Sequence, residues 1–182
     1  MAKLSKNEKL KIINDNPILW LKNFVKIIDN NGDEISFDVN EQQKDFLDNK
    51  GKFNIIAKAR QGGFSTLALG LCLFNACTKP KTNYLIVSYK QESSTSLFEK
   101  LKDMYDTLPH DKYQFPKIKH NNRGIFSLDN GSKIQCSVAG LKDVGRGSTY
   151  EYIHLSEFAF YVNQEKILLS AEQSLAKNPH SM

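Results

Sequence analysis

Apolar and polar residues alternate along this chain with two different periods, one helical and one typical of strands. Helical spacing of apolar residues predicts helices over 7–25, 91–109 and 163–177. In the second of these, Leu97, Leu101 and Met104 share one face. A shorter helix is expected to begin near Asn40, and 65–78 is apolar almost all round, as in a helix packed against a sheet.

Short apolar runs rich in β-branched residues predict the strands. Buried strands are expected at 52–59 and 82–89, and a further strand within 150–161 ends in a carboxylate. The turn sequences Asn-Asn-Gly-Asp and Asp-Asn-Gly predict hairpins within 25–39 and 124–139. The remaining segment, 112–123, is polar and basic.

The order of these elements predicts an α/β fold. Strands that alternate with helices form a mainly parallel sheet joined by right-handed crossovers and flanked by helices. Ligands of such sheets bind at the carboxyl ends of the strands. Two candidate motifs, the loop after Ala57 and the acidic residue Glu157, follow predicted strands directly.

The first motif, AKARQGGFST at 57–66, resembles a phosphate-binding loop with its lysine displaced. The usual pattern is G-x-x-x-x-G-K-[ST] between a strand and a helix. With Gly63 as the second glycine, Ser65 takes the place of the magnesium-binding residue, while Phe64 replaces the lysine and Lys58 the first glycine. Glycines permit convergent N–H groups, and the helix start adds partial positive charge. A Gly-Gly turn between strand and helix also occurs simply as a turn, so the loop alone does not establish a phosphate-binding site.

The second motif is YIHLSE, in which apolar residues lead into Ser156 and Glu157. This is the form of the acidic strand of a phosphate-loop ATPase, where an Asp-Glu pair usually holds magnesium and activates water. A carboxylate at a strand end can also simply face solvent. Its occurrence after the glycine loop, in an α/β pattern, favours the ATPase interpretation.

Four segments in order resemble the N-terminal ATPase domain of large terminase subunits of tailed bacteriophages. They are QQKDFL, AKARQGGFST, IVSYKQESSTSLFEKL and VGRGSTYEYIHLSEFAF, which together extend over nearly the whole chain. Many members of that family carry a loop with the lysine moved forward. The resemblance implies a phosphate-loop ATPase that uses ATP and Mg²⁺ to drive DNA packaging.

The resemblance also implies roles for individual residues. Gln43 would read the adenine edge, Lys58 would bind phosphate, and Arg60 would stabilise charge on the γ-phosphate. Arg146 would sense phosphate, and Glu157 would activate water. The nucleotide-binding set comprises Gln43, Lys58, Ala59, Arg60, Gln61, Gly62, Gly63, Phe64, Ser65, Thr66 and Arg146.

Magnesium would be held by Ser65, assisted by Thr66, and by Ser156 in the place of the usual aspartate. Because serine carries no charge, the phosphates and water would supply the rest of the metal shell. Lys52 and Lys90 lie outside the motifs.

Family partners implied by the resemblance are double-stranded DNA, the portal protein, the small terminase subunit and sister subunits in a ring. The implied location is the cytoplasm of an infected bacterium. The family continues with a coupling strand and a nuclease domain. We therefore expect 1–182 to be one partial ATPase domain, with 1–40 as a helical and hairpin extension, and with an uncovered sheet edge.

Composition is compatible with this interpretation. The 182 residues are 40% hydrophobic and 25% charged, with a net charge of +5, as in a globular protein with a weak preference for acidic partners. The cysteines (Cys72, Cys77 and Cys136) lack metal-binding spacing, which favours a reducing compartment over a zinc site. No apolar run approaches the roughly 20 residues needed to span a membrane.

Two other functions stay open. A helicase-type ATPase shares an upstream glutamine and an acidic strand, but it should have a lysine where Phe64 stands. A non-catalytic module would keep the fold, bind nucleotide weakly and contact DNA, a portal or sister subunits.

Overall fold

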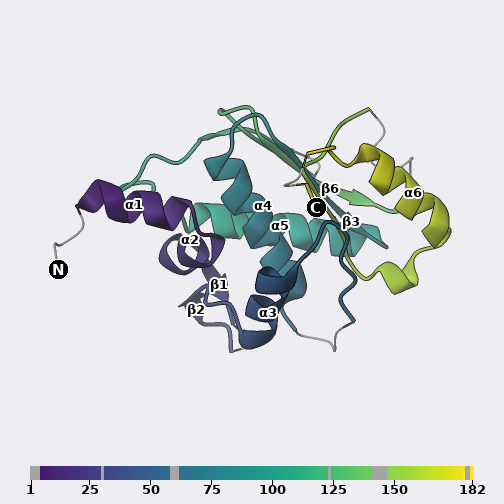
Figure 1. The fold of residues 1–182 in the computed structure, drawn as a ribbon, viewed down its shortest axis with the longest axis horizontal. Helices are drawn as coiled ribbons and strands as arrows, with labels where there is room; N and C mark the ends of the chain where they lie inside the picture. The colour runs from purple at the N-terminus through teal and green to yellow at the C-terminus, as the bar shows by residue number, and fades with distance from the viewer. Residues whose placement is uncertain (1–4, 30, 58–61, 123, 141–146, 179–180) are drawn as a thin grey trace.

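The structure is a computed structural model that describes residues 5–29, 31–57, 62–122, 124–140, 147–178 and 181–182 (Figure 1). The helices are α1 (Lys6–Asn14), α2 (Pro17–Phe24), α3 (Glu41–Asn49), α4 (Phe64–Thr78), α5 (Gln91–Asp106) and α6 (Gln164–Ser174), with a 3-10 turn η1 (Phe158–Phe160). The strands are β1 (Lys26–Ile28), β2 (Glu34–Ser36), β3 (Asn83–Ser88), β4 (Ile118–Asn122), β5 (Ile125–Leu128), β6 (Lys133–Val138) and β7 (Tyr152–Leu155).

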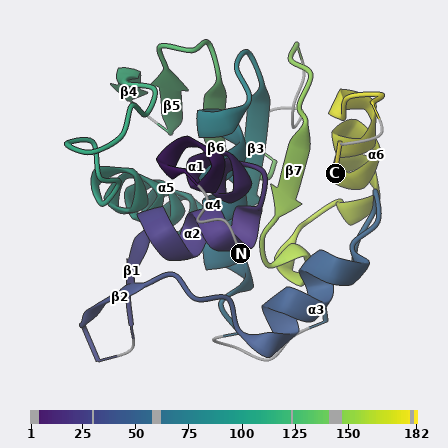
Figure 2. The ribbon, with the colours of Figure 1, turned by 60° about the vertical axis from the view of Figure 1, so that its left-hand side comes forward.

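The larger sheet has the strand order β4-β5-β6-β3-β7 (Figure 2). Strand β3 pairs in parallel with β6 on one side and with β7 on the other. Only β5 runs against its neighbours, because it forms hairpins with β4 and β6. The predicted fold class, a mainly parallel sheet with flanking helices and hairpin additions, is confirmed.

Both faces of the sheet are packed, which the sequence of β3 explains. Successive side chains of a strand point to opposite faces. Tyr84 and Ile86 belong to the larger core with α2, α4 and α5, whereas Leu85 and Val87 pack with Ile167 of α6. The sheet therefore lies between α4 and α5 on one side and α6 on the other (Figure 1).

The predicted N-terminal helix over 7–25 is two helices. Helix α1 ends at Asn14, and Asn16 caps α2, since its side chain accepts a hydrogen bond from the Leu19 amide at 3.1 Å. Pro17 occupies the first helical position of α2, where its missing N–H costs nothing. The break lets α2 bury Trp20 completely while α1 buries no residue.

Most other predicted elements are confirmed. The hairpins β1–β2 and β5–β6 form at the Asn-Gly turns, and α3 begins after Asn40, which caps it. Helices α5 and α6 fall within the predicted ranges, α4 begins one residue before its predicted range, and Leu97, Leu101 and Met104 are buried together. Among the described helices, none is long and apolar enough to cross a membrane.

The predicted buried strand at 52–59 is wrong over its described part. Residues 52–57 form no strand, Ile55 is 100% exposed, and Phe53 is 64% exposed. The outer edge of β7 is bridged instead by C-terminal residues. The Tyr150 amide donates to the Ser174 carbonyl at 2.9 Å, and the Ile153 amide to the Met182 carbonyl at 2.8 Å. An apolar run cannot become a buried strand without a sheet edge beside it.

The polar, basic stretch at 112–123 contains a strand that the sequence did not predict. Strand β4 pairs antiparallel with β5, and every residue of β4 is exposed. Lys119 and His120 lie on this edge strand. Charged and polar residues are typical of edge strands, because they discourage pairing with other chains.

Candidate functional site

Two segments far apart in sequence meet at the carboxyl end of the parallel sheet. Ser65 is the second residue of α4, and Ser156 directly follows β7. Their hydroxyl oxygens lie 3.3 Å apart, within hydrogen-bonding distance, and Ser156 is buried. The two motifs of the sequence therefore lie side by side, although 91 residues separate these serines.

The start of α4 has no side-chain cap. Gly63 is its cap and adopts the left-handed conformation, with φ at 69°, so no side chain caps this helix. The first N–H groups of a helix have no partner within the helix. Together with the helix dipole, such N–H groups can bind an anion, as they do in phosphate loops.

The side chain of Gln43 holds this glycine turn in place. Its side-chain amide donates to the Gly63 carbonyl at 3.0 Å, while its Oε1 accepts from the Asn40 amide at 3.0 Å. The side chain is only 4% exposed. The positive φ favours glycine at position 63, and a Cβ there would lie 2.7 Å from Gln43 Nε2 and displace that amide. The glutamine expected to read adenine thus already uses both of its polar atoms within the protein, Nε2 at the glycine turn and Oε1 at the cap of α3.

Glu157 stands beside the serine pair in an unusual backbone conformation. Its φ of 57° and ψ of 41° are left-handed, a conformation that costs a non-glycine residue free energy. Two hydrogen bonds hold the surrounding turn to the end of β3. The Val87 carbonyl accepts from the Ser156 amide at 2.8 Å and from the Tyr161 hydroxyl at 2.7 Å. Burial, and secondarily the charge of Glu157, raise the pKa of Tyr161, which therefore stays a protonated donor.

Ser65, Ser156 and Glu157 open into a pocket of about 390 Å³. The opposite wall comes from the segment that follows β3 and from the first turns of α5. That wall consists of Lys90, Glu92, Ser93, Ser96, Leu97 and Lys100. Sequence reasoning missed this wall and placed Lys90 outside the motifs. The order of the strands would have indicated it. Because β3 pairs in parallel with β7, Lys90, which follows β3, lies at the same carboxyl end of the sheet as Glu157.

A larger hollow, of about 1040 Å³, lies on the other side of the glycine turn. It is bounded by α3 and by residues 50–57, and its lining includes Phe46, Phe53, Ile56, Gly62 and Phe64. Phe64 is buried and packs edge-on against Phe46, with ring centroids 5.9 Å apart. The residue that replaces the usual lysine is therefore a core residue, which explains its apolar character.

The oxygen atoms at the site fit magnesium in kind. Hydroxyl and carboxylate oxygens are ligands that Mg²⁺ accepts, usually together with water and substrate phosphates. The described residues contain no group of three or more His, Cys, Asp or Glu side chains able to hold a metal ion. The hydroxyls of Ser65 and Ser156 thus suit a metal that arrives with a phosphorylated ligand.

The cysteines do not contribute to this site. All three are free, and burial raises the pKa of Cys77 and of Cys136 to about 12. Burial also raises the pKa of Cys72, with a smaller contribution from Cys136. At neutral pH the three thiols are therefore protonated.

Several predicted site residues lie outside the described residues: Lys58, Ala59, Arg60, Gln61 and Arg146. Of the others, Gln43, Gly62, Gly63, Phe64 and Ser65 occur together at the glycine turn, and Ser156 and Glu157 join Ser65. Thr66 follows Ser65 in the first turn of α4.

Comparison with known proteins identifies the fold. The structure is similar to that of the HK97 bacteriophage large terminase, with a TM-score of 0.71 and 16% sequence identity, over 91% of this chain and 36% of that chain. This chain thus spans about a third of that protein. The Thermus phage P74-26 large terminase ATPase domain matches with a TM-score of 0.48 and 16% identity, over 74% of this chain and 65% of that one. No protein-family model matches the chain, and no curated protein matches its sequence.

Replacing Gln43 tests whether it supports the loop. Gln43→Ala leaves the Gly63 carbonyl and the Asn40 amide without their buried partner, so we expect unfolding free energy to fall by about 1–3 kcal/mol. Urea denaturation measures this. The adjacent exposed variant, Gln42→Ala, is the control and should change stability by less than ~0.5 kcal/mol. Equal stability of the two variants would show that the Gln43 contacts contribute nothing.

Proposed function

We propose that this chain is the ATP-binding and ATP-hydrolysing module of a large terminase subunit of a DNA-packaging motor. The observation that carries the proposal is the contact of Ser65 with Ser156, 3.3 Å apart, beside Glu157 and behind the glycine-capped start of α4. A phosphate-binding helix start and an acidic strand end meet there. The likeness of the fold to the HK97 large terminase supports the same assignment.

The residues divide the chemistry between them. The first-turn N–H groups of α4, with the charges of Lys58 and Arg60, would bind and orient the phosphates. The hydroxyls of Ser65 and Ser156 would hold Mg²⁺, with Thr66 next in the turn. Bound magnesium neutralises charge on the transferred phosphoryl group. Glu157 would accept a proton from the attacking water, and Arg146 would contact phosphate.

The base of the nucleotide would occupy the larger hollow beside α3. Phe46, Phe53 and Ile56 offer it apolar surface. Gln43 would contact adenine only through its second amide hydrogen, because its Oε1 and the other amide hydrogen bind within the protein. Its main contribution would then be to set the position of Gly63.

Phe64 argues against a helicase-type site. A lysine in that place would have to leave the buried position that Phe64 fills against Phe46. One observation supports the non-catalytic alternative. Residues 52–57, which precede the loop, do not pair in the sheet. Because misplacement of about 1 Å can slow catalysis roughly 100-fold, we expect slow turnover by the 182-residue chain.

The proposal extends to partners. A packaging motor would act on double-stranded DNA, with the portal protein and the small terminase subunit, as a ring of sister subunits in the cytoplasm of an infected bacterium. The basis for these partners is the family resemblance of the four sequence segments together with the likeness of the fold to the HK97 protein.

Titration with ATP, with and without Mg²⁺, tests the nucleotide site. Lys58→Ala removes the proposed phosphate cation, so we expect ATP affinity to fall by about tenfold or more, equivalent to ~1.4 kcal/mol, without unfolding. Calorimetry measures the affinity, and circular dichroism checks the fold. Lys52→Ala is the matched control. If Lys58→Ala binds as tightly as the parent, the displaced lysine is not a phosphate ligand.

Glu157→Gln separates binding from hydrolysis. Glutamine keeps the size and hydrogen-bonding capacity of the side chain but removes the base. We expect unchanged ATP affinity and a single-turnover hydrolysis rate lower by roughly two or more orders of magnitude, the scale of general-base loss. Radiolabelled ATP with protein in excess makes slow turnover measurable. Undiminished hydrolysis by the variant would mean that another residue activates the water.

A further inference from the structure

We propose that Lys90 and Lys100 form a second cationic wall of the site and bind the terminal phosphate of a nucleoside triphosphate. This inference rests on the proposed function and adds the residues that would distinguish a triphosphate from a diphosphate. Neither lysine belongs to the glycine loop or to the acidic strand, and both line the pocket of Ser65, Ser156 and Glu157.

The fold brings the two lysines to this pocket by separate routes. Lys90 directly precedes α5, where the chain leaves the carboxyl end of β3. Lys100 lies within α5, seven residues after Ser93. Residues spaced by three, four and seven positions share one face of a helix. Ser93, Ser96 and Lys100 are therefore one polar stripe of α5, and all three line the pocket.

The position of the pocket indicates which part of a nucleotide it would receive. Gly62 and Phe64 line the larger hollow, whereas Ser65 lines the smaller pocket, so the two spaces flank the same glycine turn. A nucleotide with its base in the larger hollow crosses this turn. Its terminal phosphate then lies beside Ser65 and Ser156 and faces the lysines.

The charges of the pocket leave both lysines available. The charged groups lining it are Lys90, Lys100, Glu92 and Glu157. Lys90 Nζ is 4.0 Å from a Glu92 carboxylate oxygen, and the two side chains are 49% and 79% exposed. Such an exposed pair contributes little free energy, so a phosphate oxygen competes with it easily. Among the described residues, no carboxylate lies within 4.0 Å of Lys100 Nζ.

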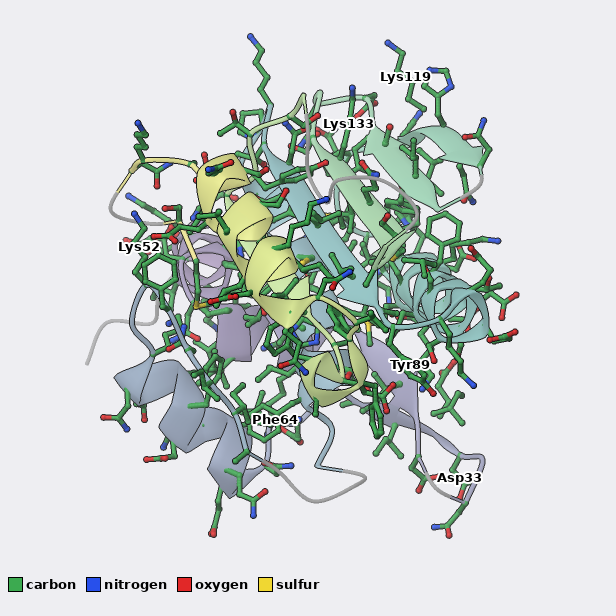
Figure 3. The ribbon with its side chains drawn as sticks, turned by 90° about the vertical axis from the view of Figure 1, so that its right-hand side faces the viewer. Asp33, Lys52, Phe64, Tyr89, Lys119 and Lys133 are labelled. Atoms are coloured by element: carbon green, nitrogen blue, oxygen red, sulfur yellow. The ribbon has the colours of Figure 1, made fainter. Side chains whose placement is uncertain are left out.

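Tyr89 further orients Lys90. The Lys90 ammonium lies 5.5 Å from the centroid of the Tyr89 ring, and that ring packs against Phe160 beside the Glu157 turn. Figure 3 shows Phe64 and Tyr89 toward one end of the sheet and Lys119 and Lys133 at the opposite end. Lys119 therefore carries the same charge on an exposed strand remote from the pocket.

The test compares two nucleotides that differ in the terminal phosphate. In the presence of Mg²⁺, the dissociation constant of each protein is measured for AMP-PNP, a non-hydrolysable triphosphate analogue, and for ADP. The proteins are the parent chain, Lys90→Gln, Lys100→Gln, the double variant, and Lys119→Gln as the control. We expect the double variant to bind AMP-PNP about tenfold more weakly, while its ADP affinity stays within about twofold of the parent.

Each other result overturns the inference in an identifiable way. Equal weakening of AMP-PNP and ADP would assign the lysines a general electrostatic effect, and the same loss in Lys119→Gln would do so too. Unchanged affinity for both nucleotides would remove the lysines from the site while leaving the proposed function intact. A parent chain that binds neither nucleotide would overturn the inference together with the proposed function.

Discussion

The parallel pairing of β3 with β7 is the interaction on which the site depends. The register sets Val87 opposite Leu155, so that the two strands end at the same level. The ladder continues one step further, where the Ser156 amide donates to the Val87 carbonyl. A slip of one residue would turn every side chain of β7 to the other face. Ser156 would then leave Ser65, and the two motifs would no longer share a site.

The same carbonyl of Val87 links stability to chemistry. It accepts from Ser156 in the strand ladder and from Tyr161 at the end of the following turn. Between these two anchors lies Glu157, in a backbone conformation that isolated residues of its type avoid. The glycine turn has a comparable support, since Gln43 holds the Gly63 carbonyl. Hydrogen bonds from the surrounding protein thus fix both the glycine turn and the Glu157 turn, while Ser65, Ser156 and Glu157 line the pocket.

Much of this arrangement could be predicted from the sequence because its signals are local. The helical spacing of Leu97, Leu101 and Met104, the Asn-Gly turns and the apolar run of β3 each specify an element within a few residues. The position of Ser65 and Ser156 at the carboxyl end of the sheet follows from the order of strands and helices. The resemblance of the quoted segments to large terminase subunits led to the same fold as the structure.

What could not be predicted depends on distant partners. The apolar run at 52–57 has the composition of a buried strand, but Met182 bonds to Ile153 on the outer edge of β7 instead, and Ser174 and Ala176 bond to Tyr150 just before that strand. Strand β4 is polar apart from Ile118, and it forms by antiparallel pairing with β5.

Lys90 and Lys100 lie in one of the segments that resemble the terminase family, but that resemblance gave them no role. They reach the site because β3 neighbours β7, a fact of sheet order rather than of sequence pattern.

The most direct measurement is a map of backbone amide shifts in the nitrogen-15-labelled chain as Mg²⁺ and AMP-PNP are added. The central claim is that one nucleotide site unites the glycine turn, the end of β3 and the end of β7. The account predicts saturable shifts concentrated at 62–66, 88–93 and 156–157, with the β4–β5 hairpin unaffected. Shifts centred on that hairpin, or no saturable shift anywhere, would contradict it.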